Sequence, residues 1–107
     1  MSSAILINCF EVAPEQDQRF LQLWRQADDL LRHRGGYRTT RLHRALDPRT
    51  RFRYVNVAEL DSVETWQSAV GSPEFAAIAA QMADFSPSPG LYTVEAAHSA
   101  AQEAPNR

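Results

Sequence analysis

The sequence predicts an α+β domain with the ferredoxin-like split βαβ topology, in which helices cover one face of a four-stranded antiparallel sheet. Segments of strand and helix periodicity follow one another in the order strand, helix, strand, strand, helix, strand. The chain has 107 residues, 44% of them hydrophobic, and a net charge of -2, which suits one core and excludes intrinsic disorder. We therefore assign residues 1–98 to one domain and expect residues 99–107, polar and alanine-rich, to form a flexible tail.

The first part of this pattern is a strand followed by a long helix. Residues 4–12 alternate with both faces mainly apolar, so we expect a central strand. A helix should begin at Pro14, since proline fits a first helical turn, and apolar residues recur at helical spacing to about Arg32. Gly35 and Gly36 should end it, because glycine readily adopts the positive φ found at helix C-termini.

A hairpin is expected next, with strands over 37–45 and 52–60. The residues between them include Asp47-Pro48, a pair typical of turns because proline presets φ and aspartate bonds the turn backbone. In the ferredoxin-like topology the second of these strands lies beside the first strand of the chain.

A broken helix and a last strand complete the pattern. Residues 61–70 have a helix cap and helical spacing, the Gly-Ser-Pro sequence at 71–73 interrupts them, and the helix resumes over 74–83. The serine- and proline-rich residues 85–90 predict a loop, and the alternation of residues 91–97 predicts the fourth strand.

One face of this sheet has no helix to cover it. We expect the side chains on that face to include Ile5, Ile7, Cys9, Val55 and Val57, which are too apolar to face water. The sequence therefore predicts that a partner sheet covers them.

Charge and composition exclude several classes of protein. All eleven basic residues are arginines and eight of them lie between residues 32 and 53, but the domain is acidic overall and has no recognition-helix pattern, so we expect no nucleic-acid partner. We expect these arginines to protect a sheet edge or to pair with carboxylates of another subunit. No apolar stretch approaches the roughly 20 residues of a membrane span, and no basic leader is present, so we expect a cytoplasmic protein with no membrane contact. One cysteine and three scattered histidines predict no metal site.

Two asparagines, Asn8 and Asn56, stand within apolar strand faces. A buried amide must find a hydrogen-bond partner. Because the two strands are expected to be neighbours, both amides could enter one cavity and polarise a ligand oxygen there. The alternative is that they bond each other or nearby backbone and only fix the strand register.

A third polar candidate, His43, is expected on the first hairpin strand. With Tyr37 or Tyr54 it could accept a phenolic proton near neutral pH. The alternative is a partly exposed or interface histidine.

Several segments resemble the antibiotic biosynthesis monooxygenase domain over about residues 4–97. The segments that carry the resemblance are Asn8-Cys9-Phe10-Glu11-Val12, Gly36-Tyr37, Leu42-His43-Arg44, residues 52–62 and Pro73-Glu74-Phe75.

The resemblance implies a homodimer of the dimeric α/β barrel superfamily, in which two sheets pack together and each subunit holds a pocket between its sheet and helices. Members of this family oxygenate polycyclic phenols without metal or flavin, oxidise quinols or degrade haem. We therefore expect a cofactor-independent monooxygenase acting with dioxygen on a small electron-rich aromatic, such as a phenol, a hydroquinone or a polyketide-like compound. The alternative is a non-catalytic protein of the same fold that binds a small hydrophobic ligand.

Site residues follow from the two asparagines and the resemblance together. Asn56 and Asn8 would polarise the substrate oxygen, Trp66 would pack against the aromatic ring of the substrate and His43 would accept a proton. The rest of the pocket is expected to comprise Phe10, Trp24, Tyr54, Leu60 and Phe75.

Two positions depart from the family's patterns. Asn56 matches the asparagine of the anthrone-oxidising members, but Leu60 stands where they carry a tryptophan donor. Asn8 and Trp66 match the haem-degrading members, but Ala76 stands where they carry the axial histidine, so we expect no haem and no other cofactor. The absence of the tryptophan donor at Leu60 favours ligand binding without turnover, whereas the presence of Asn56 favours an oxygenase reaction.

Overall fold

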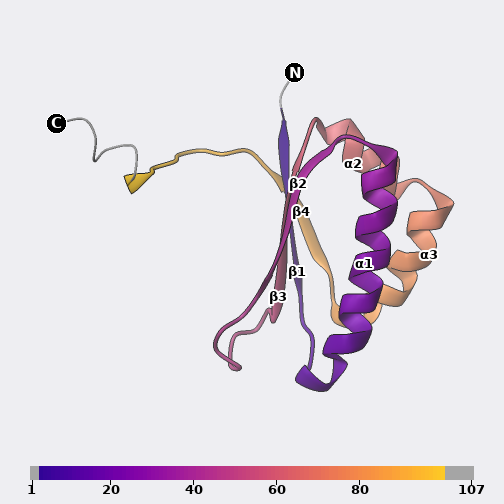
Figure 1. Ribbon diagram of the computed structural model, residues 1–107, viewed down its shortest axis with the longest axis vertical. Coiled ribbons are helices and arrows are strands. Elements are labelled where there is room, and N and C mark those ends of the chain that lie inside the picture. The colour runs from indigo at the N-terminus through magenta and orange to yellow at the C-terminus, as the bar shows by residue number, and fades with distance from the viewer. Residues whose placement is uncertain (1–2, 101–107) are drawn as a thin grey trace.

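The computed structural model describes residues 3–100 and has the predicted ferredoxin-like architecture. Its four-stranded antiparallel sheet has the strand order β2-β3-β1-β4, and all three α-helices lie on one side of it (Figure 1). The elements are β1 (Ala4–Phe10), a 3-10 turn (Pro14–Gln16), α1 (Asp17–Arg34), β2 (Tyr37–Arg44), β3 (Tyr54–Leu60), α2 (Val63–Val70), α3 (Pro73–Met82), a second 3-10 turn (Ala83–Phe85) and β4 (Ser88–Tyr92). Most of the expected tail, residues 101–107, lies outside the described residues.

The caps of α2 and α3 and the glycines after α1 lie where the sequence predicts them, whereas Pro14 begins a 3-10 turn and α1 itself begins at Asp17. Ser62 and Ser72 cap α2 and α3, with their hydroxyl groups accepting from backbone N–H groups three residues on. Gly36 has a φ of +86°, and a Cβ there would lie 2.7 Å from the Thr65 side chain. Glycine is therefore required where the chain passes from α1 into β2 close to α2.

The last strand differs from the prediction. β4 spans Ser88–Tyr92, so it begins within the expected loop and ends well before residue 97. The prolines suggested a loop, but β4 is an edge strand that pairs only with β1, and an edge strand tolerates Pro89 without its N–H.

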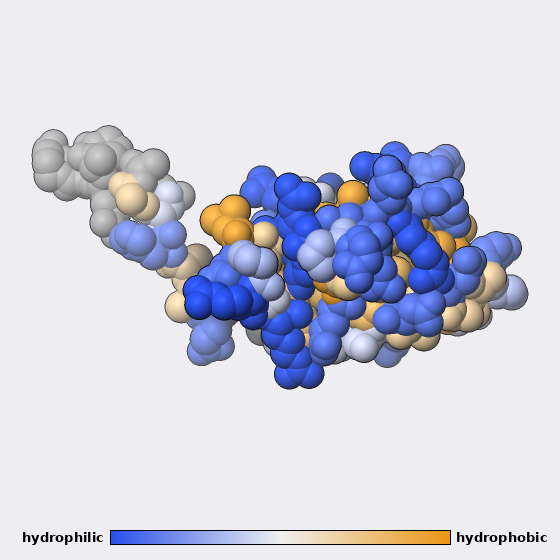
Figure 2. Space-filling view, turned by 90° about the horizontal axis from the view of Figure 1, so that it is seen from below, coloured by the Kyte–Doolittle hydropathy of each residue, from blue (hydrophilic) through white to orange (hydrophobic). Residues whose placement is uncertain are grey.

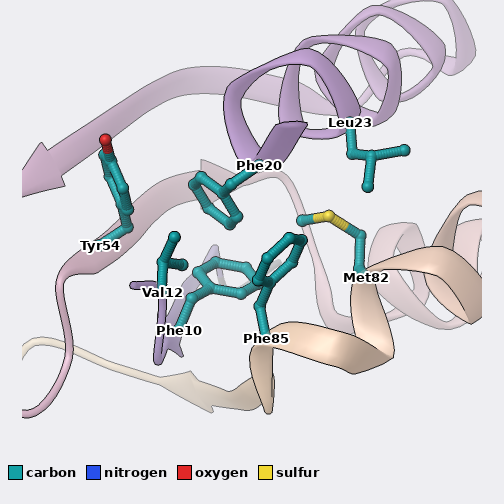
Figure 3. Packing of buried hydrophobic residues seen from close by; sticks show 7 residues of the cluster. All are labelled: Phe10, Val12, Phe20, Leu23, Tyr54, Met82 and Phe85. Carbon is teal, nitrogen blue, oxygen red and sulfur yellow. The ribbon is translucent and has the colours of Figure 1, made fainter. Parts of the chain in front are cut away.

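The main core is an aromatic cluster between α1 and the sheet (Figure 3). Phe20 is fully buried at its centre, with ring centroids 4.9 Å from Phe10, 4.6 Å from Tyr54 and 5.3 Å from Phe85. Fully buried Leu60 belongs to a second, smaller cluster near the other end of β3. These two clusters hold the helices against the sheet.

The other face of the sheet carries no helix (Figure 1). Ile5, Ile7, Cys9, Val55 and Val57 lie on it and are each partly accessible in the single chain. The expected bare apolar face is therefore present.

Four of the hairpin arginines, Arg38, Arg49, Arg51 and Arg53, pair with carboxylates of the same chain. Arg53 makes a bidentate contact with Asp17 at 2.8 and 2.7 Å, and Arg51 lies 3.1 Å from Glu11. Seen from the end at which the β2–β3 hairpin turns, the surface is predominantly hydrophilic (Figure 2). No helix in residues 3–100 is long and apolar enough to cross a membrane.

We predict that Phe20→Ala lowers the free energy of unfolding by about 3–5 kcal/mol, because it empties the centre of the aromatic cluster. Urea unfolding at neutral pH measures the change. Leu46→Ala, at a fully exposed hairpin position, should change it by less than about 0.5 kcal/mol. Equal losses in the two variants would contradict the assignment of the core.

A second prediction concerns acid stability. The Arg53 guanidinium holds the pKa of Asp17 below its usual value, so the pair stabilises the fold above the ordinary carboxyl pKa and loses that effect as the pH falls through the folded-state pKa. Asp17→Asn should therefore be less stable than the wild type at pH 7, and the difference should shrink below about pH 4.

Urea unfolding as a function of pH tests this. Asp84→Asn is the control, because Asp84 and its partner Arg19 are both well exposed and such pairs contribute little. A difference for Asp17→Asn that stays constant down to about pH 3 would show that the carboxylate is not the source of the effect.

Candidate functional site

A cavity of about 400 Å³ lies between the helix-covered face of the sheet and the helices. Three helices and two central strands contribute to its walls, and β4 with the residue before it closes one side. The lining residues are Leu6, Asn8, Phe10, Trp24, Ala27, Leu31, Asn56, Trp66, Val70, Phe75, Ala76, Ile78, Ala79, Met82, Pro87 and Pro89. Apart from the two indoles, Asn8 and Asn56 carry the only polar side chains in this lining.

The two asparagines lie directly opposite each other in the β1–β3 ladder. Cross-strand partners share one face of a sheet, with Cβ atoms about 5 Å apart. Because Asn56 is 8% exposed and faces the helices, Asn8 faces them as well. The register thus brings together the two amides that the sequence analysis singled out.

Each amide is held through its oxygen. The Trp24 indole Nε1 donates to Asn56 Oδ1 at 3.2 Å, and the Ser88 backbone N–H donates to Asn8 Oδ1 at 3.0 Å. The amides do not bond each other, and neither Nδ2 has a protein partner within residues 3–100. The contact to Ser88 is the expected backbone-bonding alternative for Asn8, but both NH₂ groups remain unused.

Aromatic rings make up the rest of the predicted wall. Trp66 packs edge-to-face on Phe75, with ring centroids 5.7 Å apart and an interplanar angle of 80°. Trp24 and Phe10 also line the cavity. A planar aromatic ligand would therefore find ring faces and edges close to the two amides.

Three of the expected site residues do not line the cavity. Tyr54 and Leu60 are buried in the two core clusters. His43 lies opposite Val55, on the helix-free face of the sheet, where it is exposed with its Nδ1 3.2 Å from the Val55 carbonyl oxygen. Strand alternation separates it from Asn56 by the whole thickness of the sheet.

The lining of the cavity contains no acidic, basic, tyrosine or cysteine side chain. Behind Trp24 lies a separate hollow of about 160 Å³, which Asp28, Arg32 and Tyr37 help to line. Burial raises the pKa of Tyr37 to about 12, so this phenol stays protonated at neutral pH. The residues that line the cavity therefore offer hydrogen-bond donors and apolar surface but no side-chain base.

No group of three or more potential metal ligands occurs in the part of the chain that the structure describes. Ala76 lines the cavity, and its methyl group cannot ligate iron.

Sequence reasoning did not find the Trp24–Asn56 hydrogen bond. The signal was present, because a buried indole N–H and a buried amide each need a partner, but α1 and β3 are far apart in sequence and the pairing is tertiary. Pro87 and Pro89 were also not expected in the lining, because the fourth strand was predicted too late in the sequence.

These features define a ferredoxin-like α+β protein with an apolar, amide-bearing cavity under its helices. The sequence of residues 3–81 matches the antibiotic biosynthesis monooxygenase family, and the chain belongs to that family. No curated protein matches the chain.

Solved structures share the fold. SnoaB from Streptomyces nogalater is described as a cofactor-independent oxygenase. The structure of its single-residue variant is 18% identical in sequence to this chain, with a TM-score of 0.79 over 91% of this chain and 97% of SnoaB. A proposed monooxygenase from Shewanella loihica is 24% identical, with a TM-score of 0.76 over 90% of this chain and 97% of that one. A dimeric ferredoxin-like protein of unknown function from Bacteroides fragilis is 16% identical, with a TM-score of 0.67 over 86% of this chain and 96% of that one.

Proposed function

We propose that this protein is a cofactor-independent monooxygenase that oxidises a small electron-rich aromatic compound with dioxygen. The observation that carries the proposal is the pair of asparagine amides, Asn8 and Asn56, set between aromatic walls in an otherwise apolar cavity. Such a cavity has the volume of a small-molecule site, and its amides can orient one oxygen of the ligand.

The chemistry needs no group that the chain lacks. An ionised phenol or its carbanion form passes one electron to dioxygen, and the two radicals combine to a peroxide. Loss of water from the peroxide leaves a carbonyl, so that a phenol with a free ring C–H and O₂ give a quinone and water. Asn8 and Asn56 hold the substrate oxygen, and Trp66 with Phe75 holds the ring.

The likeness to SnoaB supports the same reading, because that fold neighbour is described as a cofactor-independent oxygenase. The second candidate function, binding of a small hydrophobic ligand without turnover, is favoured by the apolar lining and by Leu60, whose side chain is buried in the core and offers no donor.

Oxygen consumption by metal-stripped protein tests the proposal. With a panel of anthrones, naphthols and hydroquinones, we expect uptake that depends on the protein and falls about 10²- to 10³-fold in Asn56→Ala, because a donor to the developing oxyanion is lost. Gln22→Ala is the matched control and should retain activity, since it removes an exposed amide on α1 that does not line the cavity.

The outcomes separate the candidates. Circular dichroism must show that Asn56→Ala is folded, and Asn8→Ala provides a second cavity variant. Uptake that is equal in the wild type and both asparagine variants would place the chemistry elsewhere. No uptake with any compound, together with ligand-induced quenching of tryptophan fluorescence, would favour the binding role.

We also propose that the protein is a homodimer formed through the helix-free face of the sheet. That face presents Ile5, Ile7, Val55 and Val57 to solvent in the single chain. The segment that follows β4 leaves the sheet on the same side (Figure 1). Fold neighbours from Bacteroides fragilis and Jannaschia sp. are described as dimeric.

Sedimentation equilibrium should give twice the 12.0 kDa subunit mass at micromolar concentration. Ile7→Glu, at the middle of the apolar face, should shift the mass towards one subunit, because dimerisation would bury an unpaired carboxylate. Ala80→Glu, exposed on α3, should leave it unchanged. A wild-type mass of one subunit would overturn the dimer.

A further inference from the structure

The cavity reaches the surface beside α2. Trp66 and Val70 of this helix line it, and Val70 is 41% exposed. Ala76, Pro87 and Pro89 also belong to the lining and are exposed to solvent. A side chain that both lines a cavity and meets solvent lies at its mouth, so α2 forms one border of the opening.

α2 is a short helix with little buried side-chain surface. Of its eight residues only Ala69 is buried, and Trp66 packs against the smaller core cluster. α3, in contrast, contributes Met82 and Ile78 to the main aromatic cluster, and the Gly-Ser-Pro sequence at 71–73 separates the two helices. Elements with few buried contacts open locally at low free energy. α2 can therefore move while α3 and the main core stay in place.

An arginine from another helix holds α2. Arg34, the last residue of α1, donates from Nη2 to the Ser68 carbonyl oxygen at 3.2 Å and to Ser68 Oγ at 2.8 Å. α2 lies beside this end of α1 (Figure 1). Within residues 3–100, no other side-chain hydrogen bond joins α2 to the chain outside residues 62–72, and Arg34 has no carboxylate partner.

The contact meets a need that α2 does not satisfy by itself. The last carbonyl groups of a helix have no partner within it, and a positive charge is favourable at this end. The carbonyl groups of Gln67 and Ala69 accept from the N–H groups of residues 71 and 72, and the Ser68 carbonyl accepts from Arg34. Because the last turn of α2 contains no basic residue, Arg34 supplies both the donor and the charge.

From these contacts, and resting on the proposed use of the cavity as a ligand site, we infer that α2 is a lid on the cavity and that Arg34 is the positioning residue that holds it closed. When the two bonds to Ser68 break, Trp66 and Val70 move away from the mouth and a ligand enters or leaves.

Hydrogen exchange measured by mass spectrometry tests the opening without any ligand. In Arg34→Ala the backbone amides of residues 66–70 should exchange about tenfold faster than in the wild type, because the closed helix loses two hydrogen bonds from a charged donor. Arg34→Lys keeps the charge and should give an intermediate rate. Arg32→Ala is the matched control and should change nothing in α2, because Arg32 is an exposed arginine of the same turn that pairs with Asp28 and Asp29.

The kinetics of ligand binding test whether this motion admits a ligand. 4-Nitroanisole, a small neutral aromatic compound, quenches tryptophan fluorescence, and both tryptophans of the chain line the cavity. In Arg34→Ala its association and dissociation rate constants should both rise about tenfold, because a lid that opens more often speeds entry and exit alike. The Kd and the midpoint of urea unfolding should stay unchanged. A purely structural role of Arg34 would instead change one or both of these equilibrium quantities.

Each result supports or overturns the inference. Exchange in α2 that is equal in the wild type and Arg34→Ala, or equally fast in Arg32→Ala, would overturn the role of Arg34. Faster exchange with unchanged rate constants for 4-nitroanisole would overturn the lid, and so would absence of binding by the wild type. Failure of the proposed oxygenase is seen separately, as absence of oxygen uptake by a protein whose exchange and binding kinetics follow the expected pattern. Oxygen uptake with unchanged probe kinetics would overturn the lid and leave the oxygenase.

Discussion

The hydrogen bond between the Trp24 indole and the Asn56 amide is the contact on which the site depends, because it joins α1 to the centre of the sheet. A buried amide or indole without a partner costs about 1–3 kcal/mol, so each group secures the other in place. The bond joins the Trp24 side chain to β3 and turns the Asn56 NH₂ group away from Trp24. One hydrogen bond therefore positions both the Trp24 ring in the cavity wall and the Asn56 amide that makes the cavity polar.

Because side chains alternate along each strand, the two faces of the sheet have different roles. Residues that face the helices build the core and the cavity, with Phe20 packed at one end and Leu60 at the other. Residues that face away, such as Ile7 and Val57, form an apolar surface that the helices do not cover and so do not bury. A domain of this size has only one core, so the second face adds stability only if another sheet covers it.

Most of the fold could be predicted from the sequence because its signals are local. Period-two alternation in β1 and β3 indicated which residues share a face, and the caps at Ser62 and Ser72 marked the helix starts. β4 was misplaced because proline is a loop signal unless the strand lies at an edge, which is a tertiary fact. The same limit applies to the site. The pairing of Asn8 with Asn56 followed from topology, whereas the partner of each amide depended on α1 and β4.

The two unused NH₂ groups are a consequence of that tertiary arrangement. An asparagine with both ends satisfied inside the protein would only fix the strand register, and an asparagine with neither end satisfied would be mobile and costly to bury. Asn8 and Asn56 lie between these cases. One donor binds the Oδ1 atom of each amide, which fixes the direction of its NH₂ group and leaves that group free to bind a ligand. Preorganised donors of this kind bind a charge without reorganising when it develops. Because the rest of the lining is apolar apart from the indoles of Trp24 and Trp66, these two amides supply most of the polarity of the cavity.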